Sequence, residues 1–508
     1  MGIDNKRVDR TPCISLEQKD NLLFVRSPNM RVFNEVCAFL TFTRTVREKE
    51  EGRFIFSSSD ERCFEPSLND PFVIICPAGF KDMLIRRFNE ECHFTLSCRR
   101  DRRIVENTKP DWSLLDPSVV FRSGQREILE KMFDADRGRI SVPTAVGKSF
   151  LICQYARLMP KARIIVSTYS NQVLNQLYED LKRVVPGQVG LCSGSKKTGK
   201  HHRIVCVSLG TLHQFFPLER EQNVDVLIVD EYHECGSESR LEMLQSVAKA
   251  KMFGLSANQE RPDKAEFRLN GLFGPLLAQM NYTEAVQKGL VTPICVVWTP
   301  VKSDRDPAAF YSDPTAKERH GLWRYAHRNK TIAEVARLFA DEDQVLIPVK
   351  TIDHALHLKK YLPEYAVVYG PQDNLSGNMR KFHAMGLLKG IPPMTQDRLN
   401  KLKYLFSVGR LKKVIATTVW SRGVNFPQLS VIIRADGMQS CIADTQWPGR
   451  AARKQDDKII SLIFDFTDEY NPGFQAKAAG RRRNYTKHKW NQITLDELHE
   501  ITDQYSED

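Results

Sequence analysis

The feature that most constrains the fold of this chain is an alternation of short apolar segments with amphipathic helical segments, which begins near residue 121. Within one such segment, Val173, Leu174, Leu177 and Leu181 recur at the spacing of a single helix face. The alternation pauses over a polar stretch at residues 301–320 and then resumes. Because parallel strands are joined by crossover helices, this pattern predicts two successive α/β domains, each with a parallel sheet. The expected strands are 140–142, 163–167, 203–207, 226–229 and 251–255 in the first domain, and 344–349, 366–369, 414–417, 430–434 and 458–464 in the second.

The residues before about 109 follow a different pattern. Strand-like runs at 54–56 and 72–76 accompany one helical run in which Phe80, Leu84 and Phe88 share a face. A proline-containing linker is expected at 107–118. The polar stretch at 301–320 is expected to be a second linker, between the two α/β domains. The predicted domains are a small α+β domain at 1–109, two α/β domains at 110–300 and 301–475, and a basic segment with an acidic tail at 476–508.

Composition narrows the class of protein. Apolar residues make up 42% of the 508 residues and charged residues 27%, which is ordinary for a globular protein. No stretch is long and apolar enough for a transmembrane helix, and the start lacks the apolar core of a signal peptide, so we expect a cytoplasmic protein without membrane contact. The net charge of +12 favours a polyanionic partner. The twelve cysteines contain no Cys-x-x-Cys pair and are interpreted as reduced thiols, although a metal site near Cys92, His93 and Cys98 stays open.

A glycine-containing loop joins an expected strand to an expected helix at residues 143–149. Its backbone N–H groups, at a helix start, would bind phosphate. Lys148 would reach the terminal phosphates and the Ser149 hydroxyl would ligate Mg²⁺. The loop departs from the usual spacing at its first glycine, which is Val142 here. The residues predicted to bind the nucleotide through this loop are Pro143, Thr144, Ala145, Val146, Gly147, Lys148 and Ser149.

Two further elements fit the hydrolysis of a nucleoside triphosphate. Asp230 and Glu231 follow a buried strand, where Asp230 would hold Mg²⁺ and Glu231 would polarise the attacking water. Arg450 and Arg453 lie three residues apart on one expected helix and would act as arginine fingers from the second domain. Read alone, a carboxylate pair after a strand often only caps a helix, and the arginines are equally compatible with a solvated basic helix.

In order and spacing, these motifs resemble those of the superfamily 2 helicases. The resemblance covers about residues 121–468 and implies two tandem RecA-like motor domains that clamp ATP between them. It also implies further site residues. These are Arg122 and Gln125 for adenine, Gly423 and Gln446 at the nucleotide, His233, Ser256 and Ala257 for coupling, and Thr168, Thr211 and Thr418 for nucleic acid. Asn258, Ser167 and Asn425 depart from the residues usual in this family, which weakens the carry-over of coupling roles there.

Within that superfamily, the amino-acid sequences of the loop and of residues 273–292 are similar to those of the phage UvsW-type branch-migration helicases. A shorter likeness at Pro77–Phe80 implies that the N-terminal domain binds nucleic acid. The resemblance therefore implies an ATP- and Mg²⁺-dependent monomer, in a bacterial host if phage-encoded, that remodels branched, forked or duplex DNA. RNA in hybrids is a further partner compatible with the resemblance. A motor subunit of a restriction or defence complex, an RNA helicase and a non-catalytic ATP-gated clamp stay open as alternatives.

The C-terminal basic run, residues 477–490, has two interpretations. It contains Arg481, Arg482 and Arg483 close to Tyr485 and Trp490. A solvated charged face is the simpler interpretation. The alternative is a nucleic-acid contact in which the three arginines neutralise phosphates and an aromatic ring stacks on a base.

Overall fold

The computed structural model describes residues 13–506, apart from 51–52, 93–94, 101–107, 144–145, 195, 213–223, 246, 248–249, 258–265, 373–376, 422–423, 425 and 456–457. The chain divides into two compact units. The first is Met1–Val142 with Gly147–Gln279, and the second is Pro143–Val146 with Met280–Asp508. No helix in the described part of the chain is long and apolar enough to cross a membrane.

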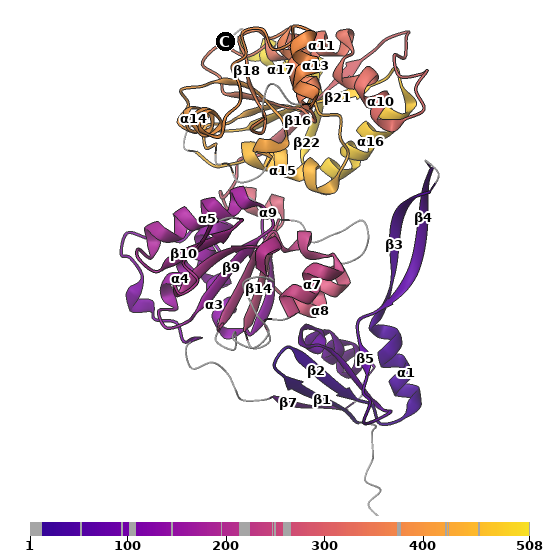
Figure 1. Ribbon diagram of the computed structural model, residues 1–508, viewed down its shortest axis with the longest axis vertical. Helices are drawn as coiled ribbons and strands as arrows, with labels where there is room; N and C mark the ends of the chain where they lie inside the picture. Colours follow the sequence, from indigo (N-terminus) through magenta and orange to yellow (C-terminus); the bar gives the residue numbers. More distant parts are fainter. Residues whose placement is uncertain are drawn as a thin grey trace, which may run out of the picture. The chain divides into compact units, whose positions relative to one another are not determined.

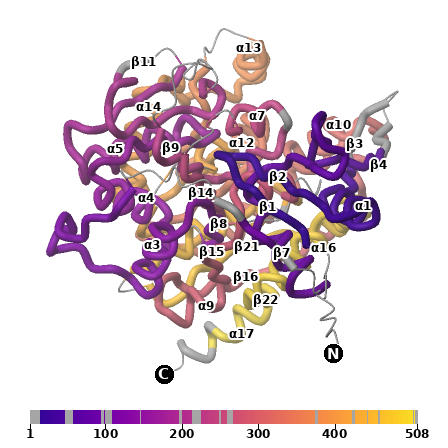
Figure 2. Tube along the Cα trace, turned by 90° about the horizontal axis from the view of Figure 1, so that it is seen from below, coloured from indigo at the N-terminus to yellow at the C-terminus, as the bar shows by residue number. Residues whose placement is uncertain are grey.

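The first unit begins with a small α+β domain, as the sequence predicts. Its five-stranded sheet has the order β5-β6-β2-β1-β7, and β1, β2 and β7 lie side by side (Figures 1 and 2). Alternate residues of the strands face a core that also receives the expected helix, in which Phe80, Leu84 and Phe88 are buried. The elements are β1 (Cys13–Lys19), β2 (Leu22–Arg26), α1 (Met30–Phe39), β5 (Glu65–Pro66), β6 (Val73–Pro77), α2 (Lys81–Leu84), the π-helical η2 (Ile85–Glu91) and β7 (Thr95–Arg100).

A long hairpin leaves this domain as a separate two-stranded sheet. It consists of β3 (Thr41–Glu50) and β4 (Arg53–Arg62), which pair antiparallel over their whole length (Figure 1). At its base, Arg44 donates to Glu61 at 3.0 Å, and Glu61 also pairs with Arg268 of the following domain.

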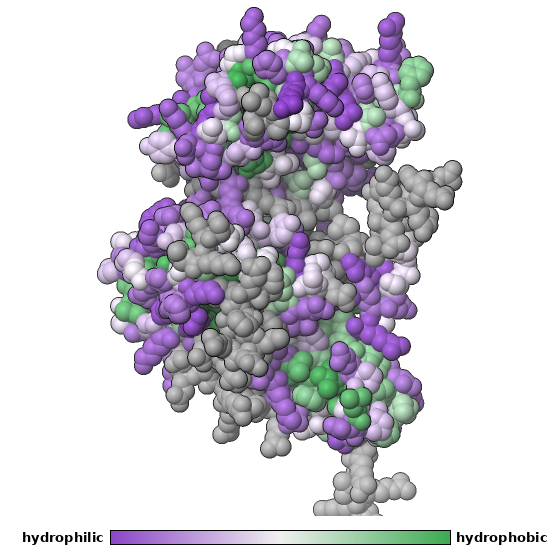
Figure 3. All heavy atoms as spheres, viewed as in Figure 1, coloured by the Kyte–Doolittle hydropathy of each residue, from purple (hydrophilic) through white to green (hydrophobic). Residues whose placement is uncertain are grey.

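Hydrophobic side chains gather over the N-terminal domain in Figure 3, whereas hydrophilic ones cover most of the visible face of the second unit.

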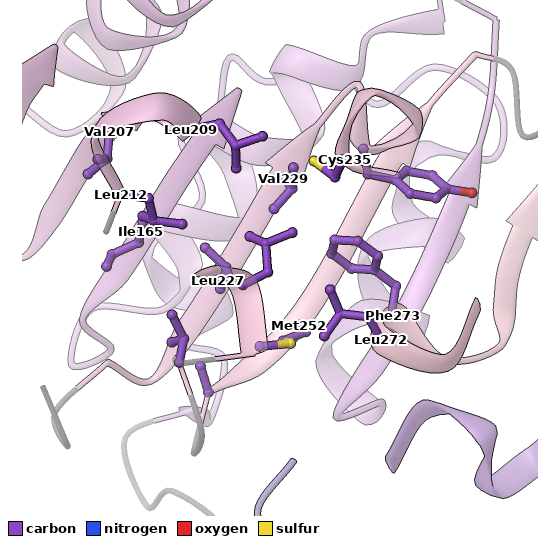
Figure 4. Packing of buried hydrophobic residues seen from close by; sticks show 14 of the residues in the cluster. Ile165, Val207, Leu209, Leu212, Leu227, Val229, Cys235, Met252, Leu272 and Phe273 are labelled. Carbon is purple, nitrogen blue, oxygen red and sulfur yellow. The ribbon is translucent and has the colours of Figure 1, made fainter. Parts of the chain in front are cut away.

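The rest of the first unit is an α/β domain with an eight-stranded sheet of order β11-β10-β12-β9-β13-β14-β8-β15. All neighbouring strands are parallel except the edge strand β11. The central strands carry buried valine, isoleucine and leucine side chains on both faces of the sheet. Figure 4 shows Ile165, Leu227, Val229 and Phe273 in one cluster. The strands are β8 (Arg137–Ser141), β9 (Ile164–Thr168), β10 (Val189–Ser193), β11 (Lys196–Thr198), β12 (Ile204–Ser208), β13 (Val226–Asp230), β14 (Lys251–Ser256) and β15 (Leu276–Gln279), and the helices are α3 (Gln125–Asp134), α4 (Lys148–Leu158), α5 (Asn171–Val184), α7 (Glu238–Gln245) and α8 (Glu266–Phe273).

The N-terminal domain packs directly on α8 of this α/β domain. The missing Cβ of Gly79 would lie only 2.2 Å from the backbone oxygen of Gly271, so the two segments touch backbone to backbone. Phe80 packs against Phe267 with 5.1 Å between the ring centroids and an angle of 39° between the rings. Buried Asn21 donates to the oxygen of Val247 at 2.6 Å and accepts a hydrogen bond from Arg137. These contacts join the two domains of the first unit into one packed body.

The second unit is an α/β domain around a seven-stranded, all-parallel sheet of order β18-β19-β17-β20-β21-β16-β22. The two α/β domains and the α+β domain confirm the predicted fold class. The strands of the second unit are β16 (Ile294–Val301), β17 (Val345–Pro348), β18 (Ala366–Val368), β19 (Lys413–Ala416), β20 (Val431–Ile433), β21 (Ser461–Asp468) and β22 (Asn491–Thr494). Its helices are α9 (Tyr282–Gln287), α10 (Pro314–Glu318), α11 (Ala326–Ala336), α12 (Ile352–Lys359), α13 (Gly377–Ala384), α14 (Gln396–Ser407), α15 (Cys441–Ala451), α16 (Pro472–Lys487) and α17 (Leu495–Ser506).

Three expected boundaries differ from the structure. The first α/β domain does not extend to 300, because β16 pairs with β21 and β22 of the second sheet. The polar stretch 301–320 is not an interdomain linker, since it follows β16 and carries α10 within the second unit. The segment 476–508 is not an appendage to the second domain, because α16 packs on β21 and β22 is an edge strand of the same sheet.

Candidate active site

Polar residues end five parallel strands at one edge of the first sheet. Ser141, Thr168, Ser208, Asp230 and Ser256 are the last residues of β8, β9, β12, β13 and β14. The register pairs Asp230 with Thr168 and Ser256 with Ser141. Because the carboxyl ends of parallel strands and the amino ends of the following helices meet here, this edge is where an α/β domain binds phosphate-containing ligands.

The phosphate-binding loop enters α4 through Gly147, which has a φ of +104° that favours glycine. Lys148 is the first residue of α4 and is 5% exposed, and Ser149 is half-buried beside it. Pro143 and Val146 lie in the loop, whereas Thr144 and Ala145 are outside the described residues. The structure therefore places Lys148 and Ser149 at a helix start, as the nucleotide-binding prediction requires.

Lys148 reaches across to the two carboxylates predicted for hydrolysis. Its Nζ lies 2.5 Å from Oε1 of Glu231 and 3.9 Å from Oδ1 of Asp230. Glu231 has a φ of +54°, an unusual value for a residue other than glycine, which turns the chain sharply after β13. The three predicted residues thus meet, and the lysine takes the position of a counter-ion between them.

The carboxyl group of Asp230 has the properties of a metal ligand. Burial raises its pKa to about 6, against the lowering effect of Lys148. Its Oδ1 atom is buried without a hydrogen-bond partner, although buried polar atoms are normally paired. A hard, oxygen-seeking cation such as Mg²⁺ would satisfy this atom, so the donor set formed by Asp230 and Ser149 fits that metal.

His233 links the carboxylates to the next strand. Its Nδ1 lies 2.7 Å from Oγ of Ser256, at the end of β14, and 3.4 Å from Oε2 of Glu231. Both His233 and Ser256 are buried, and half-buried Ala257 follows them. Of the three residues predicted for coupling, His233 thus lies beside Glu231, Ser256 is linked to it through His233, and Ala257 follows in the chain.

The expected adenine-reading residues lie at the start of α3 and just before it. Gln125, the first residue of α3, is buried, and its Oε1 accepts a hydrogen bond from the backbone N–H of Arg122 at 2.9 Å. A Cβ on Gly147 would come within 2.8 Å of the Gln125 Nε2, so the amide lies against the loop. Arg122 itself is exposed.

The predicted arginine fingers belong to α15 of the second unit. Arg450 is 6% exposed and donates to the backbone oxygens of Val424 at 2.8 Å and of Ser421. Arg453 donates to Val424 at 3.4 Å, and burial lowers its pKa to about 10. Gln446 is half-buried on the same helix, and Gly423 lies outside the described residues. The role of these side chains toward ATP stays a prediction.

The nucleic-acid contacts predicted from sequence have mixed outcomes. Thr418 is exposed and Thr211 is half-buried, with its hydroxyl 2.8 Å from that of Ser208. Thr168 is 1% exposed, so its side chain is not available at the surface as the prediction requires. The prediction is wrong for Arg481, which is 1% exposed and forms a forked pair with Asp465 of β21 at 2.9 Å. Arg482 and Arg483 are exposed, and Arg482 lies 4.7 Å from the ring of Trp298.

A buried charged network below α15 was missed by the sequence reasoning. Arg434 donates to Asp444, in the first turn of α15, at 2.9 Å, and Asn484 of α16 donates to the other oxygen of Asp444 at 2.6 Å. Tyr485 joins Arg434 to Asp465 through its hydroxyl. The available signal was a charged residue at the end of one apolar run, Arg434, and another inside a second run, Asp465.

Comparisons with known proteins agree with this site. Residues 118–261 match the family described as type III restriction enzyme, res subunit, and residues 328–455 match the helicase conserved C-terminal domain. The DNA 3'-5' translocase XPB2 of Sulfurisphaera tokodaii is 23% identical over 70% of this chain and 84% of its own length. The ATP-dependent DNA helicase uvsW of Enterobacteria phage T4 is 22% identical over 68% of each chain.

Solved structures give the same fold. Dbp5 of S. cerevisiae, bound to RNA and ADP BeF3, matches 75% of this chain and 93% of its own, with a TM-score of 0.50 and 13% identity. The two matched family domains fall on the two α/β domains and include the lysine, the carboxylates and the arginines described above. The chain belongs to the superfamily 2 helicases and is an ATP-dependent nucleic-acid helicase.

Proposed function

We propose that this helicase acts on DNA and remodels branched structures, by regressing forks, migrating four-way junctions and removing R-loops during phage replication, recombination or repair. The cluster of Lys148, Asp230 and Glu231, joined through His233 to β14, supports the ATP hydrolysis that such remodelling requires. Both sequence relatives reported above are named as DNA helicases or translocases. The net charge of +12 suits a partner that is bound mainly through its phosphates.

Each residue of the cluster has a distinct role in the proposed hydrolysis. Lys148 leaves Glu231 and contacts the terminal phosphates of ATP, which removes a counter-ion from that carboxylate. Glu231 then orients the attacking water and accepts its proton. Asp230 and Ser149 would hold Mg²⁺, which supplies charge neutralisation at the phosphates. His233 contacts both Glu231 and Ser256, so the loss of the Lys148 contact at Glu231 would be transmitted through His233 and Ser256 to β14.

The arginines of α15 are proposed to act on the transition state. Arg450 and Arg453 already donate to backbone oxygens, so each would exchange a carbonyl for a phosphate oxygen when ATP is present. Replacing either by alanine should lower kcat far more than it raises KM, since finger arginines bind the transition state more tightly than the ground state. A change confined to KM would make that arginine a ground-state contact.

The decisive experiment compares ATP hydrolysis by the full chain in the presence of single-stranded, duplex, forked and four-way DNA and of RNA. Branched DNA should stimulate turnover most. Equal stimulation by all DNA forms would overturn the branch preference, and stimulation by RNA alone would make the protein an RNA helicase. Junction migration on a labelled four-way substrate then tests remodelling directly.

A motor subunit of a restriction system is the second candidate, because the first α/β domain matches a family named for such a subunit. That role would require a nuclease or methyltransferase partner. The purified chain should then hydrolyse ATP on duplex DNA without remodelling forks by itself. Fork regression by the isolated chain would exclude this candidate.

A further inference from the structure

Arg453, one of the two proposed fingers, lies just beyond the end of α15, so the helix does not fix its position by itself. The helix ends at Ala451, Ala452 is its C-cap, and Arg453 follows. The last carbonyl groups of a helix have no hydrogen-bond donor within the helix. Other parts of the second unit must therefore supply the donors that hold this end of α15 in place.

The ammonium group of Lys458 supplies several of these donors. Its Nζ donates to the backbone oxygen of Arg453 at 3.4 Å and also to that of Ala451. A third hydrogen bond, of 2.5 Å, reaches the backbone oxygen of Leu429, which lies shortly before β20. An ammonium group has three N–H donors, so each of these carbonyl groups can receive one. Lys458 thus ties the end of α15 to the segment between β19 and β20.

The chain that follows α9 holds the same end of α15 from another direction. Val291 forms an isolated antiparallel bridge with Arg453. The N–H of Thr292 donates to the oxygen of Ala452 at 2.8 Å, and the Thr292 hydroxyl donates to the oxygen of Arg453 at 3.3 Å. Thr292 is fully buried, so these hydrogen bonds are shielded from water. The backbone of Arg453 is therefore held by Lys458 and by Thr292 together.

The side chain of Arg453 reaches the same segment as the ammonium group of Lys458. Arg453 donates to the oxygen of Val424 at 3.4 Å, and Lys458 donates to Leu429 in the same connection between β19 and β20. Both the backbone and the guanidinium of Arg453 are thus placed relative to this connection. A shift of the Arg453 backbone would consequently move the guanidinium away from the position that it occupies now.

Lys458 is a costly residue for ending a helix. It is 8% exposed, and burial together with the positive charge of Arg453 lowers its pKa to about 8. Water or a glycine turn can satisfy the carbonyl groups at a helix end without burying a charge. A buried ammonium group beside a second cation is therefore better explained by the geometry that it imposes on Arg453 than by stability alone.

We propose that Lys458 is a positioning residue for ATP hydrolysis, which fixes the backbone of Arg453 so that its guanidinium meets the phosphates of ATP on leaving Val424. Lys458 itself does not touch the nucleotide. The proposal rests on the proposed function, since it requires Arg453 to act as a finger. It assigns a catalytic contribution to a residue that lies outside the helicase motifs of the sequence.

The test measures DNA-stimulated ATP hydrolysis by the full chain carrying Lys458→Met, which keeps an unbranched side chain and removes all three donors. We expect kcat to fall on the order of 10²-fold, the loss that a misplacement of about 1 Å at a reacting group can cause. KM for ATP should change little, because Arg453 is proposed to act on the transition state. A rise in KM without a loss of kcat would overturn the proposal.

Lys413→Met is the matched control. Lys413 is 9% exposed in the same unit, and its Nζ donates to the backbone oxygens of Phe339 at 3.2 Å and Ala340 at 2.5 Å, shortly after α11. The substitution removes the same kind of buried ammonium group away from α15. Lys413→Met should therefore keep the wild-type kcat. Equal losses of kcat in the two methionine variants would reduce the role of Lys458 to stability and overturn the proposal.

A second measurement asks whether Lys458 acts through Arg453. In the Arg453→Ala protein, adding Lys458→Met should change the single-turnover rate by no more than about twofold, because the finger that it positions is already absent. The full loss in that background would show an independent effect and overturn the proposal. Thr292→Val removes only the hydroxyl bond to Arg453 and should give a smaller loss of kcat with the same dependence on Arg453, which keeps the test decisive if Lys458→Met does not fold.

The failure of this proposal can be told apart from a failure of the finger role. If Arg453→Ala alone leaves kcat unchanged, Arg453 is not a finger and the proposed function loses that residue. If Arg453→Ala lowers kcat while Lys458→Met and Thr292→Val both leave it unchanged, Arg453 keeps its role and only the proposal for Lys458 is overturned.

Discussion

At the scale of single residues, the proposed mechanism requires the ion pair between Lys148 and Glu231 to open before ATP is hydrolysed. Glu231→Gln keeps the shape of the side chain and removes the base. We expect nearly unchanged ATP affinity and a turnover lower by about 10²–10⁴-fold, which is the usual contribution of a general base. The measurement is single-turnover hydrolysis together with nucleotide binding by fluorescence.

Glu242→Gln is the control for that variant. Glu242 lies on α7 with its side chain exposed, and the substitution makes the same chemical change away from the lysine. Turnover of this control should equal that of the wild type. A Glu231→Gln protein that turned over ATP at the wild-type rate would remove Glu231 from the catalytic role.

The raised pKa of Asp230 predicts a pH dependence. Because the folded, ligand-free protein holds this pKa at about 6, the carboxylate becomes protonated as the pH falls through 6. A protonated Asp230 cannot hold Mg²⁺, so kcat/KM, which reports on the free enzyme, should decline about tenfold per pH unit below that point. The acid limb of kcat should lie at lower pH, since the bound metal favours the charged form.

The raised pKa of Asp230 affects stability in the opposite direction: acidic pH should lower activity but raise the contribution of this group to the unfolding free energy. The pKa of Asp230 is higher in the folded than in the unfolded chain, so the unfolding free energy that this group contributes rises as the pH falls from about 6 toward 4. Asp230→Asn should abolish that rise in chemical denaturation of the ligand-free protein. A kcat/KM profile that is flat from neutral pH to pH 5 would contradict the role of Asp230 in holding Mg²⁺. The same pH dependence of the unfolding free energy in the wild type and in Asp230→Asn would contradict the raised pKa.

At the scale of elements, α16 stabilises the domain from within. Arg481→Ala would leave the buried carboxylate of Asp465 without its forked partner, although Tyr485 and Arg434 stay nearby. Removing one partner of a buried pair typically costs about 3–5 kcal/mol of unfolding free energy. Chemical denaturation should show that loss for Arg481→Ala and a change below about 0.5 kcal/mol for Arg483→Ala, since Arg483 is exposed. Equal stability of the two variants would refute the structural role of Arg481.

Arg481, Arg482 and Arg483 show a feature of the structure that could not be predicted from the sequence. They are adjacent in the sequence, so composition treats them alike, yet a helix turns each toward a different environment. Arg481 faces Asp465 because α16 packs on β21, and a tertiary contact of that kind leaves no local pattern. Lys148, Asp230 and Glu231 were predictable because a loop after one strand and two carboxylates after another always meet at the same edge of a parallel sheet.

At the scale of the whole molecule, the repeated alternation of strands and helices was sufficient to predict two parallel sheets. It was not sufficient to assign β16, because an apolar strand carries no mark of the sheet it will join. The first domain therefore ends at Gln279 rather than at 300. The docking of the N-terminal domain was equally hidden, since it depends on Gly79 meeting Gly271 across almost two hundred residues.

That docking gives the last prediction, which concerns the selection of forked DNA by the N-terminal domain. A Cβ on Gly79 would overlap the backbone at Gly271 and Gly274, so Gly79→Ala should loosen the N-terminal domain from α8 without removing a residue. If that domain selects forks while held on the first motor domain, the variant should keep its basal ATP hydrolysis and lose its preference for forked over duplex DNA. Limited proteolysis should show faster cleavage between the two domains. Gly370→Ala is the control, because a Cβ there meets nothing within 4 Å, and it should retain the fork preference. A Gly79→Ala protein that is cleaved faster yet still prefers forks would assign branch recognition to the motor domains.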